Sequence, residues 1–342
     1  MYKENPIRDK TDLRALIQST NADFIAKDLI PFLKIPSFST NKEGIKEGKD
    51  FLTSYLSGFC EDIKEIEGNI NPTLLAKVDG EIKDRLLIYM MYDTQPIHKE
   101  EEWVKDPFGA EITVLPKPLD YLGKVIIARG AYNSKSSLLS FLNVVKLLKE
   151  KDKLPISLLF LIDGEEELGS PSLLKTIKQK KSLLNSCIDA FYPSIKQDLN
   201  GNLVIKLGYK GIITFTIRVS SPNKEPHSAF SAMIPNPAID LISLLNTIYV
   251  ENKFQIDSLR DPYYLSTEER SLVDNLMRSL DIERIKEKAG IFNTTESDPR
   301  TIFINYLFNP TFNISTLKSG FLKEGSINSV PNEALCNIDI RF

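Results

Sequence analysis

A strong amphipathic helix followed at once by a long apolar run constrains the fold most. Residues 137–151, SLLSFLNVVKLLKEK, place Leu and Val on one stripe at a 3.6-residue spacing, which predicts a helix. The apolar run LPISLLFLID (154–163) is typical of a buried strand. A strand ending in a turn is expected just before the helix, at 124–135. Strand, helix and strand form a β–α–β unit, so we expect parallel strand pairs and right-handed crossovers.

The rest of the first half of the chain adds helices and further strands. Apolar spacing predicts helices at 10–33 and 46–59. PTLLAKV (72–78) and RLLIYMM (85–91) are predicted to be neighbouring strands. Ser170 and Pro171 are predicted to be the cap and the first residue of a helix that follows the acidic loop DGEEELGS. These elements favour an α/β domain.

The pattern changes after residue 209. GIITFTIRVSS (211–221) alternates apolar and polar residues, as a half-exposed strand does. Asn236 and Pro237 are predicted to cap a helix at 237–248, and residues 311–317 and 333–342 are expected to be strands. Residues 252–300 are polar and expected to be partly helical. We therefore predict two domains, 1–209 with an α/β fold and 210–342 with a small α+β fold.

Length and charge exclude several classes of protein. A chain of 342 residues exceeds one ordinary core, which agrees with two domains. The net charge of −3 does not indicate binding to nucleic acid or to an anionic membrane. No apolar run approaches the roughly 18 residues needed to span a bilayer. The N-terminus has no apolar core of a secretory signal, so we expect a cytoplasmic protein.

Polar residues follow three of the expected strands. They are Asp93, then Asn133 with Lys135, and then the acidic residues 165–167. Strand ends of a parallel sheet meet in one crevice, where ligands bind in α/β proteins. Each group also has a structural explanation: Asp93 as a turn residue, Asn133 as a loop residue, and the glutamates as a solvated loop before a helix. The acidic run KEEE (99–102) is expected to be a solvated loop.

In this order the motifs carry a family resemblance. YDTQP, ARGAYNSKSS, DGEEELGS, GYKG, PHSAF and the closing VPNEALCNIDIRF together resemble the dinuclear zinc aminoacylase and dipeptidase family. That family includes acetylornithine deacetylase, succinyl-diaminopimelate desuccinylase and carnosinase-type metallopeptidases, and the last branch looks closest because of WVKDPFGAEI (103–112). The resemblance implies a zinc-peptidase-like mixed sheet flanked by helices. It also implies an inserted smaller, ferredoxin-like α+β domain that acts as a lid and in dimerisation.

The resemblance implies a ligand set that this sequence keeps only in part. The family uses two metal ions bridged by a carboxylate and a water, because two cations lower the pKa of the water and polarise the scissile carbonyl. The first histidine ligand falls on Met91, a soft thioether unsuited to zinc. The bridging aspartate falls on Asn133, and a further carboxylate ligand falls on Ile195. The glutamate ligand is kept as Glu167.

The same resemblance assigns catalytic and supporting roles. It makes Glu166 the general base and Asp93 the carboxylate that orients the first metal ligand. His227, in PHSAF, matches a histidine that stabilises the reacting oxyanion, and it can equally be a structural residue. Lys135 matches a family lysine and is expected to neutralise part of the carboxylate cluster, and Arg129 is a further candidate in the same motif. His98 is weighed as a replacement ligand against a solvated loop histidine.

These substitutions leave three functions open. The first is a degenerate relative that has lost the metal site and its activity, binds a small peptide or acyl-amino acid or partners an intact paralogue, and needs no cofactor. The second is an active dipeptidase or amidohydrolase with two zinc ions and Glu166 as base. The third is a structural or interaction protein.

The C-terminal end of the sequence raises an expectation about partners. The family's return to the catalytic domain, with its last histidine ligand, is expected to be missing, as are the final helix and strand of the small domain. Unpaired sheet edges and uncovered apolar faces promote association. We therefore expect a homo-oligomer, or a partner chain that supplies the missing segment.

Overall fold

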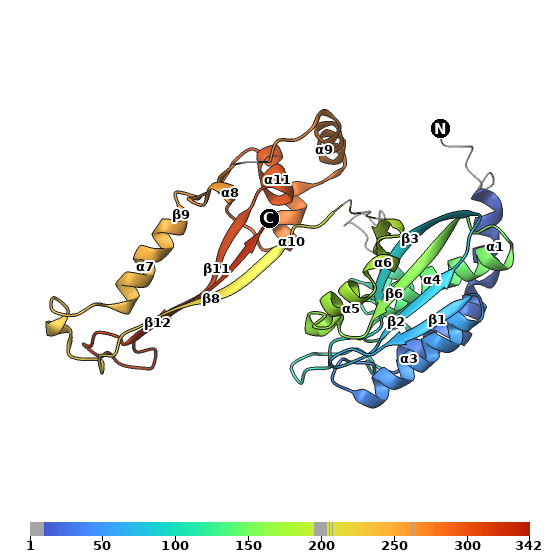
Figure 1. Ribbon diagram of the computed structural model, residues 1–342, viewed down its shortest axis with the longest axis horizontal. Coiled ribbons are helices and arrows are strands. Elements are labelled where there is room, and N and C mark those ends of the chain that lie inside the picture. The colour runs from blue at the N-terminus through green and yellow to red at the C-terminus, as the bar shows by residue number, and fades with distance from the viewer. Residues whose placement is uncertain (1–9, 195–203, 205, 207, 262) are drawn as a thin grey trace. The chain divides into compact units, whose positions relative to one another are not determined.

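The computed structural model describes residues 10–194, 204, 206, 208–261 and 263–342 (Figure 1). The chain divides into two compact units, Met1–Ile205 and Lys206–Phe342. The predicted division lies between residues 209 and 210. Because each unit has its own sheet and its own apolar core, each is described by itself.

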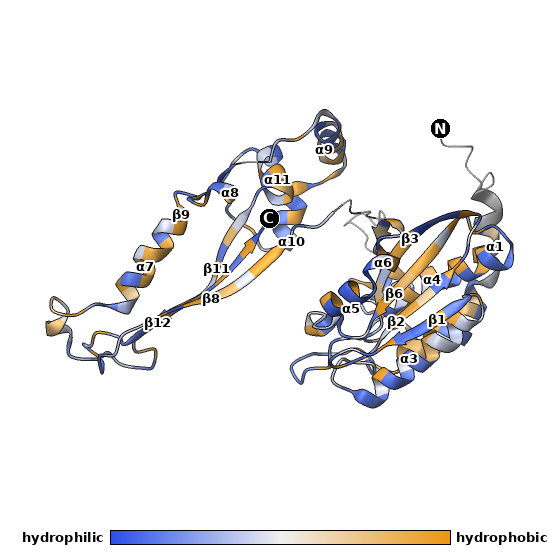
Figure 2. Ribbon diagram, viewed as in Figure 1, coloured by the Kyte–Doolittle hydropathy of each residue, from blue (hydrophilic) through white to orange (hydrophobic). Residues whose placement is uncertain are grey.

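A mixed sheet forms the centre of the first unit. Its strand order is β1-β2-β6-β3-β7, with β6 parallel to β3 and β3 parallel to β7, while β1 and β2 run antiparallel to their neighbours. Its strands are β1 (Asp62–Ile66), β2 (Thr73–Val78), β3 (Ile82–Met91), β6 (Ile156–Asp163) and β7 (Cys187–Phe191). Figure 2 shows the contrast between the hydrophobic β6 in the middle of the sheet and the hydrophilic β1 at its edge.

Two predictions about this sheet are wrong. β2 and β3 are not neighbours, because β6 lies between them. β6 is buried along seven of its eight residues, and a strand that is apolar on both faces is most stable in the middle of a sheet. The strand expected before α4 is β5 (Lys124–Ile127), which pairs with β4 (Glu111–Val114) in a separate two-stranded sheet. The β–α–β unit is therefore formed by β3, α4 and β6.

Helices cover both faces of the sheet. One face packs against α1 (Lys10–Phe24), a π-helical turn (Ile25–Leu29), α2 (Ile30–Lys34), α3 (Lys42–Ser57) and α4 (Lys135–Glu150). The other face packs Leu159 and Leu161 of β6 against α5 (Leu173–Gln179) and α6 (Lys181–Leu184). The predicted cap Ser170 is wrong: α5 is preceded by Ser172, and Ser170 has a positive φ of 51° in the turn before it.

The second unit contains an antiparallel sheet of order β11-β12-β8. Its strands are β8 (Ile212–Ser220), β11 (Thr311–Ser319) and β12 (Glu333–Arg341). α7 (Pro237–Ile248) packs on one face, and Asn236 caps it as predicted, since its side chain accepts from the Ala238 N–H at 3.0 Å. The remaining elements are β9 (Tyr249–Val250), β10 (Lys253–Phe254), α8 (Asp257–Arg260), α9 (Thr267–Ser279), α10 (Ile282–Lys288) and α11 (Pro299–Phe308).

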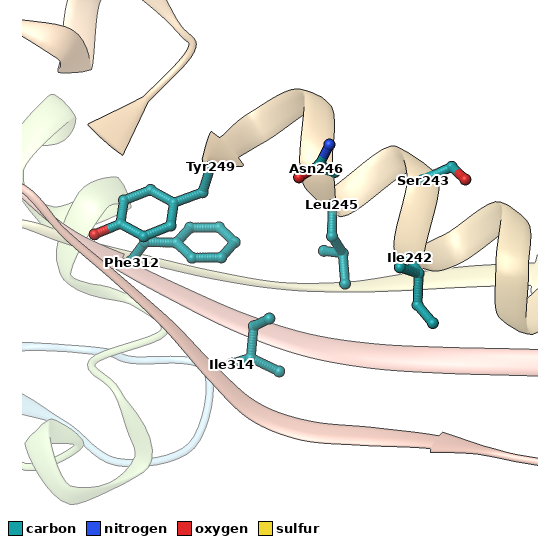
Figure 3. Close-up of a pocket in the computed structure, with 7 residues that line it drawn as sticks. All are labelled: Ile242, Ser243, Leu245, Asn246, Tyr249, Phe312 and Ile314. Atoms are coloured by element: carbon teal, nitrogen blue, oxygen red, sulfur yellow. The ribbon is translucent and has the colours of Figure 1, made fainter. Parts of the chain in front are cut away.

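A pocket of about 550 Å³ lies between α7 and β11 (Figure 3). Ile242 and Leu245 of α7 point toward Phe312 and Ile314 of β11. No carboxylate, histidine, lysine or arginine lines this pocket, so it offers contact surface rather than acid–base chemistry.

Candidate functional site

Asp93 lies just beyond the end of β3 and is completely buried. Its Oδ2 accepts hydrogen bonds from Ser39 Oγ at 2.8 Å and from the Glu167 N–H at 3.0 Å. Its Oδ1 accepts from the Glu166 N–H at 3.3 Å. Burial raises the pKa of Asp93 to about 7, and the hydrogen bonds oppose that rise. Asp93 therefore connects the end of β3 to the acidic loop after β6.

The three glutamates of the acidic loop have three different environments. Glu165 is fully buried: its Oε1 accepts from the N–H groups of Ile70 (2.7 Å) and Asn71 (2.9 Å). Its Oε2 accepts from the Ser172 N–H at 3.0 Å. Burial alone would raise the pKa of Glu165, but these hydrogen bonds hold it below its usual range. Glu165 is therefore a structural residue that ties two loops together.

Glu166 is half-buried, and burial together with the charges of Glu167 and Asp163 raises its pKa. A carboxylate with a raised pKa is suited to accept a proton near neutral pH. Asp163, the last residue of β6, is itself held by Tyr89 Oη at 3.1 Å and Ser170 Oγ at 2.7 Å. The role of Glu166 as a general base stays a prediction.

Two side-chain amides hold the carboxylate of Glu167. Asn133 Nδ2 donates to Oε1 at 3.2 Å, and Gln95 Nε2 donates to Oε2 at 2.7 Å. Gln95 Nε2 also lies 3.4 Å from the backbone oxygen of Glu167. The structure therefore brings Glu167 and Asn133 together, but not through a shared parallel sheet, because the strand before Asn133, β5, pairs with β4 in a separate sheet. It adds Gln95, which the sequence analysis does not identify.

Met91 is buried at the end of β3, with 2% of its surface exposed. Its backbone oxygen accepts from Ser134 Oγ at 2.9 Å, and its register partner on β6 is Asp163. This contact joins the end of β3 to the start of α4, next to Asn133. The position that the resemblance gives to a histidine ligand is thus filled by an apolar side chain.

Lys135 does not contact the carboxylates, contrary to the expectation that it neutralises them. Its Nζ donates to the backbone oxygens of Phe32 at 3.1 Å and Ile35 at 2.5 Å, and it lies 4.8 Å from the centre of the Phe32 ring. The side chain is completely buried, and burial lowers its pKa to about 7. Because Lys135 begins α4, its long side chain reaches the carbonyls at the end of α2.

Arg129 forms a small cluster with Glu101 and Trp103. It donates to Glu101 Oε2, its guanidinium lies 5.1 Å from the centre of the Trp103 ring, and Trp103 Nε1 donates to the same Glu101 oxygen at 2.9 Å. The prediction that all of KEEE is solvated is therefore wrong for Glu101. His98, in the same loop, is exposed, as a solvated loop histidine would be.

Two predicted site residues remain, His227 and Ile195. His227 belongs to the second unit, where its Nδ1 accepts from the Ala229 N–H at 3.1 Å and caps a short 3₁₀ turn. This contact is structural, and the proposed oxyanion role stays a prediction. Ile195 lies outside the described residues.

Whether two zinc ions fit at this site depends on which metal-ligating side chains are present. Among residues 10–194, 204, 206, 208–261 and 263–342, no three His, Cys, Asp or Glu side chains gather as a metal-binding group. Both oxygens of Asp93 already accept hydrogen bonds, and Asn133 presents an N–H₂ group to Glu167. These described side chains do not by themselves form the ligand set of a two-zinc site.

The first unit has an α/β fold with carboxylates beyond the ends of β3 and β6, and the comparisons identify the family of the chain. A model of the peptidase family M20/M25/M40 matches residues 87–300, so the chain belongs to this family. The expected mixed sheet and metallopeptidase resemblance are therefore confirmed.

Several dipeptidases are similar in sequence. The Cys-Gly metallodipeptidase dug1 of Schizosaccharomyces pombe is 26% identical over 269 residues, which cover 76% of this chain and 53% of the relative. The Beta-Ala-His dipeptidase of Rattus norvegicus is 24% identical over 284 residues, covering 79% and 54%. The chain thus spans about half the length of these curated relatives.

Two solved structures have a fold similar to that of this chain. An M20 family metallo-carboxypeptidase from Sulfolobus solfataricus has a TM-score of 0.77 and 29% identity, covering 92% of this chain and 70% of that one. Human carnosine dipeptidase 1 has a TM-score of 0.64 at 20% identity, covering 96% and 72%. In the part of the chain that is described, no helix is long and apolar enough to cross a bilayer.

Proposed function

We propose that this chain binds small peptides or acyl-amino acids in the crevice beyond β3 and β6 without hydrolysing them. The observation that supports this proposal is the amide of Asn133, which donates to Glu167 where the family resemblance requires a bridging carboxylate. An amide is neutral, so it cannot balance two cations as a shared carboxylate does. Without the metal pair, neither the water nor the scissile carbonyl is activated.

The active dipeptidase is the second candidate, and the comparisons favour it. The two relatives described above are dipeptidases, and the pKa of Glu166, beside Glu167, is raised as a general base requires. In this candidate Glu166 would accept a proton from the attacking water, and Glu167 would help to hold zinc, which would polarise the scissile carbonyl. The third candidate, a pure interaction protein, predicts that no small peptide binds.

Metal content and hydrolysis separate the first two candidates. After dialysis against trace zinc and then buffer, we expect elemental analysis to find far less than one zinc ion per chain. We also expect no cleavage of Cys-Gly or β-Ala-His above the buffer rate. About two ions per chain with metal-dependent cleavage would establish the second candidate instead. A rise in melting temperature with either dipeptide would separate peptide binding from the third candidate.

We also propose that the folded chain self-associates through the β7 edge. β7 is an edge strand among the described strands, and its Ile188 and Phe191 are 62% and 40% exposed. Unpaired edges that carry apolar side chains promote strand pairing.

Light scattering should give a mass above that of one chain, and Ile188→Lys should lower it. Ile112→Lys, a change at a similarly exposed residue on β4, is the control. A single-chain mass for the unsubstituted protein would contradict the proposal.

A further inference from the structure

The hydrogen bonds of Glu167 distinguish it from its neighbours. Two of its neighbouring carboxylates, Asp93 and Glu165, accept mainly from backbone N–H groups, which are part of the fold. Glu167 instead accepts through both of its oxygens from side-chain amides, those of Gln95 and Asn133. No lysine or arginine of the described residues forms an ion pair with it. Among the residues that the structure describes, side-chain amides are therefore the groups that stabilise its charge.

The orientation of these amides follows from their chemistry. An ionised carboxylate only accepts hydrogen bonds, so each amide must turn its N–H₂ group toward Glu167. Gln95 has a second reason to do so, because its Nε2 also faces the backbone oxygen of Glu167 at 3.4 Å. Turning either amide over would place its oxygen against a carboxylate oxygen. Both carboxylate oxygens of Glu167 are thus already hydrogen-bonded.

We propose that Gln95 and Asn133 act as positioning residues that hold Glu167 as a metal-free carboxylate and exclude divalent cations from it. This inference rests on the proposed function, since it explains how the crevice remains ordered without metal. Gln95, two residues after Asp93 in YDTQP, donates to one oxygen of Glu167, and Asn133 donates to the other. A cation that bound Glu167 would have to displace both amide hydrogen bonds. Asp93 would not offer a second free carboxylate, because both of its oxygens already accept hydrogen bonds.

The test replaces both amides by carboxylates of the same size. Gln95 and Asn133 are both exposed, so the double variant Gln95→Glu/Asn133→Asp should fold. It places three carboxylates around one point, an oxygen donor set that suits Mn²⁺. The matched control makes the same two changes at exposed amides elsewhere, Gln179→Glu with Asn185→Asp. Melting temperatures are compared in EDTA and in about 1 mM MnCl₂, with bound manganese measured by elemental analysis.

We expect the double variant to melt lower than the unsubstituted chain in EDTA, because like charges face each other. Manganese should raise its melting temperature by about 3–5 °C. The unsubstituted chain and the control should shift by less than about 1 °C. A manganese shift of the unsubstituted chain as large as that of the double variant would overturn the proposal. So would a double variant that binds no manganese, since the amides would then not be what excludes the cation.

This experiment can fail independently of the proposed function. Failure to bind Cys-Gly or β-Ala-His, measured on the unsubstituted chain, removes the peptide-binding proposal and leaves the role of the amides intact. Manganese binding by the unsubstituted chain removes the role of the amides, whether or not a peptide binds.

Discussion

Replacing Glu165 by alanine should destabilise the first unit by about 3 kcal/mol or more. The fully buried carboxylate accepts from the backbone N–H groups of Ile70, Asn71 and Ser172, and alanine leaves all three without their acceptor. Hydrogen bonds to a charged group contribute more than neutral ones, and each buried donor left unpaired costs about 1–3 kcal/mol. Urea unfolding, followed by tryptophan fluorescence of the chain's single tryptophan, Trp103, measures the change.

Glu166→Ala is the matched control, because the residue is next in sequence and of the same type. Its carboxylate is half-buried, and burial raises its pKa together with the charges of Glu167 and Asp163. Removing it relieves repulsion, so the change in unfolding free energy should stay within about 0.5 kcal/mol. Equal losses for the two variants would contradict the assignment of Glu165 as the structural glutamate.

Replacing Lys135 by methionine should remove a pH dependence of stability. Burial lowers the pKa of Lys135 to about 7 in the folded chain, whereas an unfolded lysine titrates near 10.4. Between these values the unfolded state binds one more proton than the folded state, so the unfolding free energy rises with pH. From about pH 7.5 to 9.5 the unsubstituted chain should gain about 1.4 kcal/mol per pH unit relative to Lys135→Met.

The measurement is a set of urea unfolding curves for both proteins across this range. Other titrating groups are common to the two chains, so they cancel in the difference. Lys146→Met, in the same helix, is the control: its Nζ lies 5.1 Å from the centre of the Tyr55 ring, and it should give no such slope. Parallel curves for Lys135→Met would mean that the carbonyls of Phe32 and Ile35 keep the folded lysine charged.

Local pattern predicts several of the elements well. The leucine stripe of α4, the apolar run of β6 and the capping pair at 236–237 each lie where the sequence places them. These signals depend on periodicity and on turn chemistry, which neighbouring residues determine. The strand-end argument likewise accounts for the contact between Asp93 and the loop of Glu167, because β3 and β6 are parallel and end at the same edge. It does not account for Asn133, which follows β5 of a separate sheet.

Long-range contacts decide the rest. The place of β6 between β2 and β3 and the separate sheet of β4 and β5 depend on which faces become buried together. Residues 165–167 are all glutamates, so their type does not distinguish them. Their partners in the fold do: Glu165 accepts from backbone N–H groups, Glu166 lies beside other charges, and Glu167 accepts from side-chain amides. Lys135 takes its partners from α2, roughly 100 residues away in sequence. The sequence by itself thus determines the family and the elements. Tertiary structure assigns each charged side chain its partners, because burial and hydrogen bonding come from residues distant along the chain.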